Sequence, residues 1–172
     1  RHHARPLGRV GLLGLFDELR PHGLVDEQQD CGRYRARFEF PHPAEGIDLM
    51  AGPYRIDVRT IDVDGRPIAL RTYFHPQIAE LSAGYLDSVK KYIERYSRSI
   101  GPYPYSEFSV VSSPTPTGFG FPGIAYLGID VLRLPFIRST SLGHEVLHNW
   151  WGNGVYPDVA HGNWSEGLTT FM

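Results

Sequence analysis

Hydrophobic and polar positions change their spacing along the chain, and this change divides it into a β-rich part and an α/β part. Residues 33–40 (RYRARFEF) place aromatic residues two or four positions apart, the alternation expected of a half-buried strand. Residues 54–74 alternate on both sides of Asp64-Gly65, a dipeptide typical of tight hairpin turns. Residues 1–75 are therefore predicted to be mostly β.

The spacing becomes helical from Pro76 onward. Apolar residues then recur every three or four positions, with charged residues between them, which predicts an amphipathic helix over residues 76–96. GPYP at 101–104 would end that helix, and FSVVS at 108–112 predicts a short buried strand. A loop rich in glycine and proline then leads into a second predicted strand at 124–127.

The last part of the sequence predicts two further helices. Ser139 or Thr140 is a candidate N-cap for the first, which should end at Gly152; its core-facing residues are four apart, namely Leu142, Val146 and Trp150. Residues 165–172 (SEGLTTFM) predict the second. The expected fold class is α+β, with a β-rich region over 1–75 and an α/β region over 76–172.

Composition and charge exclude some classes of function. Hydrophobic residues make up 41% and charged residues 21%, as in globular proteins with a core. The formal net charge is −2 and no dense run of Lys or Arg is present, so nucleic acid is not an expected partner. The single cysteine, Cys31, excludes an internal disulfide, and no apolar run approaches the roughly 20 residues that span a bilayer.

The opening residues 1–20 contain basic residues followed by a short apolar run. We interpret them as an amphipathic surface segment, because Asp17 and Glu18 follow the apolar run at once and no cleavage site of small residues appears. The sequence indicates no particular compartment or oligomeric state.

The strongest chemical signal is HEVLHNWW, which begins at His144. Residues four apart on a helix share a face, so His144 and His148 can both direct an imidazole nitrogen at one metal ion. Glu145 lies about 100° around the helix axis, where it can reach a water on the metal without binding the metal itself. The alternative is a helix that carries two histidines on its solvent face.

A third ligand favours the metal. Glu166 follows His148 by 18 positions, at the start of the next predicted helix. A catalytic zinc takes three protein ligands and leaves one position open, which two histidines and one glutamate would satisfy. His161, in the loop between the two helices, is interpreted as a solvated histidine because three ligands are already available.

These residues resemble a known family pattern. The zinc aminopeptidases related to aminopeptidase N, whose catalytic domain is thermolysin-like, carry H-E-x-x-H, then W-x-G-N, then a Trp shortly before Glu-Gly. The matching segments here are residues 144–148, 150–153 and 164–167. The likeness extends upstream, where AGPY at 51–54 resembles the exit from the family's N-terminal β-domain. The predicted helix at 76–96 and the strand after it resemble the first elements of the catalytic domain.

The resemblance covers roughly residues 50–172 and implies a zinc metallopeptidase that acts on a peptide substrate. It implies His144, His148 and Glu166 as ligands of one Zn²⁺. It also implies Glu145 as the general base, which takes a proton from zinc-bound water and passes it to the leaving amine. The implied fold is the end of a β-rich N-terminal domain followed by the start of a thermolysin-like catalytic domain.

One stretch departs from the family pattern. The family reads a free N-terminus with a Gly-x-Met-Glu-Asn loop, whereas GFGFPG at 118–123 contains neither Glu nor Asn. Gly118, Gly120 and Gly123 still suit the close approach of an extended peptide, so they are candidate substrate-binding residues. An endopeptidase or another zinc hydrolase is therefore an alternative to an aminopeptidase.

The end of the chain raises a further expectation. The family's transition-state tyrosine lies well beyond the glutamate ligand, and the chain stops six residues after Glu166, at Met172. We therefore expect a piece of a larger protein that is inactive alone. A scaffold without turnover is a third alternative, against which the intact Glu145 argues.

Overall fold

The computed structural model describes residues 24–30, 33–38, 42, 50, 52–158, 160 and 162–172. The chain divides into two compact units, Arg1–Tyr54 and Arg55–Met172, which are described separately. The interpreted opening segment, Cys31 and Phe40 lie outside the described residues.

The first unit contains an antiparallel pair of strands, β1 (Leu24–Asp30) and β2 (Arg33–Phe38). The strand predicted from the aromatic alternation is thus confirmed as far as Phe38.

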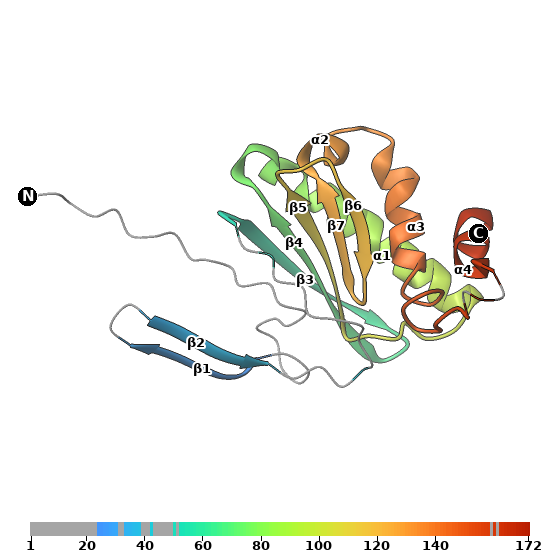
Figure 1. Ribbon diagram of the computed structural model, residues 1–172, viewed down its shortest axis with the longest axis horizontal. Helices are drawn as coiled ribbons and strands as arrows, with labels where there is room; N and C mark the ends of the chain where they lie inside the picture. Colours follow the sequence, from blue (N-terminus) through green and yellow to red (C-terminus); the bar gives the residue numbers. More distant parts are fainter. Residues whose placement is uncertain are drawn as a thin grey trace, which may run out of the picture. The chain divides into compact units, whose positions relative to one another are not determined.

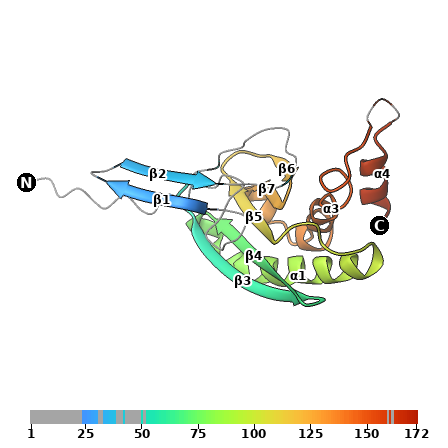
Figure 2. The same cartoon turned by 90° about the horizontal axis from the view of Figure 1, so that it is seen from below.

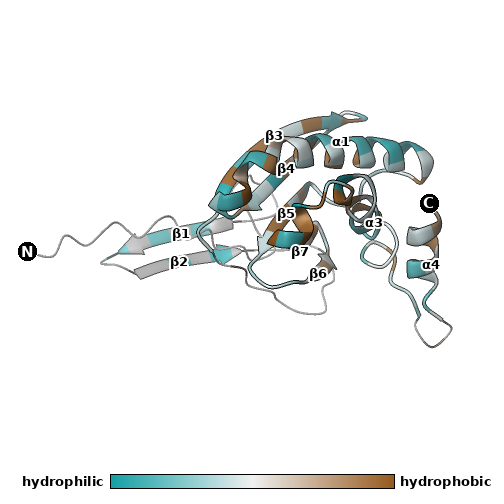
Figure 3. Cartoon of the chain, turned by 90° about the horizontal axis from the view of Figure 1, so that it is seen from above, coloured by the Kyte–Doolittle hydropathy of each residue, from teal (hydrophilic) through white to brown (hydrophobic). Residues whose placement is uncertain are grey.

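The second unit is built on a five-stranded mixed sheet with the strand order β3-β4-β5-β7-β6 (Figure 1). Its strands are β3 (Arg55–Val63), β4 (Arg66–Phe74), β5 (Glu107–Ser113), β6 (Gly118–Phe121) and β7 (Ile124–Gly128). Parallel pairing joins β4 to β5 and β5 to β7, whereas β3 and β6 pair antiparallel with β4 and β7. Polar and apolar residues alternate along β3, as the hydropathy colouring shows (Figure 3).

The hairpin of β3 and β4 confirms the predicted turn but belongs to the second unit. Asp64 and Gly65 have φ angles of 53° and 76°, the positive values that a two-residue hairpin turn needs. Ala69 to Tyr73 on β4 pair in parallel with Glu107 to Val111 on β5. Because of this pairing, the compact units divide between Tyr54 and Arg55, whereas the predicted boundary falls after residue 75.

The helices follow the sequence pattern, with some differences at their ends. They are the 3-10 helix η1 (Pro76–Leu81), α1 (Ser82–Ser99), α2 (Ile129–Leu132), the 3-10 helix η2 (Ile137–Ser139), α3 (Ser141–Leu147) and α4 (Trp164–Phe171). Thr140 is the N-cap of α3, although its side chain makes no capping hydrogen bond. Within the described residues, no helix is both long and apolar enough to cross a bilayer.

One face of the sheet packs against α1 and α3 to form the core. Figure 2 shows α1 running alongside β3 and β4. The rings of Phe74 on β4 and Tyr85 on α1 meet edge to face, with centroids 5.3 Å apart. The three predicted core residues of the α3 region are confirmed as buried: Leu142, Val146 and Trp150.

A glycine on α3 allows this helix to lie close to α1. A Cβ atom at Gly143 would lie 2.7 Å from the Tyr92 ring, which is closer than side-chain atoms normally approach. The Tyr92 hydroxyl donates a hydrogen bond to the Arg138 carbonyl just before α3, at 3.0 Å. These contacts fix α3, and with it the HEVLH segment, against the long helix.

Candidate metal centre

The end of α3 brings the two histidines together. His144 lies in the last turn and His148 at the C-cap, and their Nε2 atoms are 2.9 Å apart. The other ring nitrogen of His148, Nδ1, lies 3.0 Å from the Trp151 carbonyl, to which it donates a hydrogen bond when protonated. That bond leaves the Nε2 lone pair of His148 free to bind a metal.

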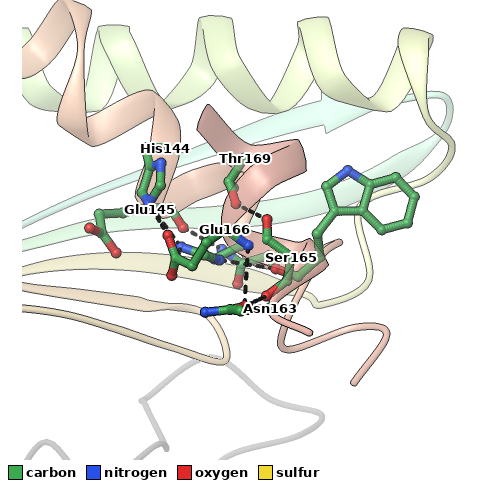
Figure 4. Close-up of polar contacts among 9 residues, drawn as sticks. His144, Glu145, Asn163, Ser165, Glu166 and Thr169 are labelled. Atoms are coloured by element: carbon green, nitrogen blue, oxygen red, sulfur yellow. Dashed lines mark hydrogen bonds and ion pairs between the residues drawn. The ribbon is translucent and has the colours of Figure 1, made fainter. Parts of the chain in front are cut away.

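Glu166 reaches the same point from α4. Its two carboxylate oxygens lie 3.3 Å from His144 Nε2 and 3.3 Å from His148 Nε2. Figure 4 shows the side chain extending from α4 toward His144. Asn163 caps the start of this helix, because its Oδ1 accepts hydrogen bonds from the Ser165 hydroxyl at 3.0 Å and from the Glu166 amide at 3.5 Å.

The segment that follows His148 allows α3 and α4 to pack closely. Gly152 has a φ angle of 116°, which side-chain-bearing residues rarely adopt. A Cβ atom there would lie 3.4 Å from His148 Nδ1 and 3.9 Å from the Ser165 Cβ. The W-x-G-N segment therefore lets α4 lie close to the His148 ring, which brings Glu166 within reach of both histidines.

The three side chains fit a zinc ion. One ligand atom from each of His144, His148 and Glu166 can be chosen so that all lie within 4.8 Å of one another. In the described part of the chain, this is the group found that could hold a metal ion. Atoms about 2.0–2.1 Å from one tetrahedral zinc are about 3.3–3.4 Å apart. The observed separations of 2.9 and 3.3 Å are close to that value. Two imidazoles and one carboxylate also leave a fourth position open.

Glu145 lies beside this group without being part of it. Its side chain is largely buried, and burial raises the pKa of the Glu145 carboxyl above its usual value. The nearby His144 and His148 act in the opposite direction and lower this pKa, while Glu166 raises it further. A carboxyl whose pKa is perturbed inside a cluster of ligands is a candidate for proton transfer.

Of the glycines predicted to bind substrate, Gly120 comes nearest to this candidate metal-binding group. Gly118 and Gly120 lie on β6, the strand at the edge of the described sheet, and Gly123 lies in the turn to β7. A Cβ atom at Gly120 would lie 2.6 Å from Glu145 Oε2 and 4.0 Å from His148 Cδ2. The edge strand therefore passes directly against the Glu145 carboxylate.

Sequence reasoning missed two features of this site. It interpreted residues 114–123 as a loop, whereas 118–121 form β6. It also gave no role to Asn149, whose fully buried side chain joins the end of α3 to the β6–β7 turn. A polar Asn149 beside the two tryptophans at 150 and 151 was the available signal. His161 lies outside the described residues.

Comparison with curated proteins gives several relatives, although no family model matches the sequence. Aminopeptidase RNPEPL1 of Mus musculus is 27% identical over 178 residues, covering 96% of this chain and 22% of its own length. Leukotriene A-4 hydrolase of Xenopus laevis is 26% identical over 176 residues, covering 94% and 26%. Aminopeptidase N of Caulobacter vibrioides is 27% identical over 169 residues, covering 86% and 19%. The chain thus spans about a fifth to a quarter of the length of these curated relatives.

Solved structures share the fold. Legionella pneumophila aminopeptidase A, crystallised with aspartic acid, superimposes with a TM-score of 0.75 at 19% identity, covering 93% of this chain and 20% of that chain. An M1 zinc metallopeptidase from Deinococcus radiodurans superimposes with a TM-score of 0.63 at 18% identity, covering 86% and 32%.

The fold and the relatives agree on the class of protein to which the chain is similar. The chain has the α+β fold of the M1 zinc metallopeptidases over part of their length. It is related to the zinc aminopeptidases of the aminopeptidase N type. The family resemblance drawn from HEVLHNWW and the predicted fold class are thereby confirmed.

Proposed function

We propose that this chain carries the metal-binding core of a zinc-dependent peptidase. The activity we favour is hydrolysis of peptide bonds in an aminopeptidase-like manner. The observation that carries the proposal is the convergence of His144, His148 and Glu166 from two helices, with the Glu145 carboxylate alongside. The names of the relatives support it, since two of those compared are aminopeptidases and one is a hydrolase.

The residues have separate roles in this proposal. His144, His148 and Glu166 hold one zinc ion, which when bound polarises a carbonyl group and lowers the pKa of a water molecule. Glu145 accepts a proton from the attacking water and delivers it to the leaving amine. Trp151 keeps the His148 ring in place through its carbonyl, which lies 3.0 Å from Nδ1.

Replacement of the proposed base tests this function. Glu145→Gln keeps the shape of the side chain but removes its capacity to accept a proton. We expect zinc content to stay unchanged and turnover of a peptide to fall by about 10²- to 10⁴-fold. Undiminished turnover would remove Glu145 from the mechanism. A full-length wild-type protein that binds zinc but hydrolyses no peptide would instead indicate a scaffold without turnover.

We also consider a second candidate function, an endopeptidase or another zinc hydrolase that tolerates a blocked N-terminus. It is favoured by the residues around β6, which offer little negative charge to a substrate ammonium group. Gly120 has no side chain with which to hold a substrate ammonium group. Glu107, the acidic residue that precedes this loop, directs Oε2 to the Arg71 guanidinium at 2.6 Å, so its charge is already balanced. Comparing kcat/KM for matched free and N-acetylated peptides separates the two functions.

A further inference from the structure

Asn149 follows the second histidine and uses its whole side chain in hydrogen bonds. Its exposed fraction is 0%. The Oδ1 atom accepts a hydrogen bond from the Gly123 amide at 2.8 Å. The Nδ2 atom donates to the Val146 carbonyl at 2.9 Å and to the Glu145 carbonyl at 3.3 Å. One amide group thus joins two separate segments of the chain.

These segments are the two sides of the candidate site. Carbonyl groups in the last turn of a helix are often short of backbone donors, and here the Asn149 side chain donates to two of them in α3, those of Glu145 and Val146. On the other side, Gly123 has a φ angle of 75°, and a Cβ atom there would lie 3.2 Å from the Glu107 carbonyl. The turn is therefore closely packed, and its amide hydrogen is directed at Asn149.

The distance between these two sides matters because β6 lies in close contact with the Glu145 side chain of α3. From Gly123 the chain leads back along β6 to Gly120, where a Cβ atom would lie 2.6 Å from Glu145 Oε2. A small movement of the turn would change how a peptide along β6 meets Glu145. No other side-chain hydrogen bond among those found in the described residues joins the end of α3 to this turn.

We propose that Asn149 is a positioning residue, whose amide holds the β6–β7 hairpin at the separation from α3 at which a bound peptide meets Glu145. This inference rests on the proposed peptidase function. The chemistry requires an amide, because one side must accept a hydrogen bond and the other must donate two. Aspartate lacks the donors, and leucine lacks both.

The test compares Asn149→Leu with wild type and with a matched control. Tyr103→Phe removes a buried hydroxyl that lies 3.3 Å from Asn149 Oδ1 but leaves the bridge between the helix and the turn intact. Amide hydrogen exchange over residues 118–124 is measured in the metal-free protein. Zinc content is measured next, followed by KM and kcat for a dipeptide and a tetrapeptide.

In Asn149→Leu we expect faster exchange across the hairpin and unchanged zinc content. We also expect kcat/KM to fall about tenfold for the tetrapeptide, mainly through KM, and less for the dipeptide, which makes fewer contacts along β6. Tyr103→Phe should resemble wild type in all these measurements. If the leucine variant does not fold, Asn149→Asp takes its place, because aspartate has the same shape as asparagine. Aspartate lacks the two donors, so hydrogen exchange and kcat/KM should change in the same direction as in Asn149→Leu.

Two outcomes separate the failure of this inference from failure of the proposed function. If the full-length wild-type protein hydrolyses no peptide, the peptidase function is wrong, whereas the exchange measurement still reports on the bridge. Unchanged exchange and unchanged KM in both Asn149 variants would overturn the positioning role. Loss of zinc, or an equal change in Tyr103→Phe, would also overturn it, because Asn149 would then support the structure generally.

Discussion

Replacing Gly120 by alanine probes how closely the edge strand approaches the proposed base. The new Cβ atom would lie 2.6 Å from Glu145 Oε2, whereas ordinary contact begins at 3.4 Å, so the two must separate by about 0.8 Å, the difference between these distances. The carboxylate is the far end of a flexible side chain and β6 is paired with β7, so we expect the carboxylate to move.

The size of this displacement sets the expected effect. A misplacement of about 1 Å can reduce a rate by about 100-fold, and general-base catalysis contributes about 10²- to 10⁴-fold. We therefore expect kcat to fall by about 10- to 100-fold in Gly120→Ala, which corresponds to about 1.4–2.7 kcal/mol in the activation free energy. Zinc content should not change, because the new Cβ would be 4.0 Å from His148 Cδ2, the nearest atom of a proposed ligand side chain.

Steady-state kinetics and metal analysis of three variants provide the assay. Gly118→Ala lies on the same strand and face, and its Cβ atom would be 3.6 Å from Leu127 Cδ2, so we expect a clearly smaller loss of kcat than in Gly120→Ala. Gly167→Ala, next to Glu166, would meet nothing within 4 Å and should keep the wild-type rate. Full kcat in Gly120→Ala, or an equal loss in Gly118→Ala, would refute the reasoning.

Two further predictions concern specificity and pH. A hydrogen bond to a charged group contributes about 1.5–3 kcal/mol, and residues 118–123 contain no carboxylate that could make one to a substrate amine. We therefore expect the ratio of kcat/KM for free over N-acetylated peptides to stay below about a thousand, whereas a higher ratio would show that another acidic group anchors the amine. Burial raises the pKa of Tyr85 from 10.0 to about 12, so its contribution to stability is complete below pH 10 and is lost as the pH rises toward 12. The thermal unfolding temperature should therefore fall less steeply with pH over this range in Tyr85→Phe than in wild type. Parallel curves of unfolding temperature against pH would contradict this explanation.

The sequence predicted those parts of the fold that depend on local patterns. Asp64-Gly65 specifies its turn through the backbone preferences of two adjacent residues, and the helix of α1 follows from apolar residues at helical spacing. The two helices of the candidate metal centre were predictable for the same reason, because His144 and His148 are about one helical turn apart and Glu166 lies in the first turn of another helix.

Features that depend on distant parts of the chain were not predictable in this way. The pairing of β4 with β5 joins residues separated by the whole of α1, so the unit boundary could not be placed from local periodicity. β6 has a sequence of glycine and phenylalanine without polar alternation, and it is a strand because it pairs with β7. The importance of Asn149 depends on Gly123, its partner 26 positions earlier.

Zinc stoichiometry in wild type, His148→Ala and Glu145→Gln tests the central claim most directly. His148 Nε2 lies 2.9 Å from His144 Nε2 and 3.3 Å from the Glu166 carboxylate, so its removal takes away one of three ligands. Glu145 is adjacent to His144 in the sequence but is proposed as the base and not as a zinc ligand. We expect about one zinc per chain in wild type and in Glu145→Gln, and a large loss in His148→Ala. Full zinc content in His148→Ala, or none in wild type, would contradict the proposed metal centre.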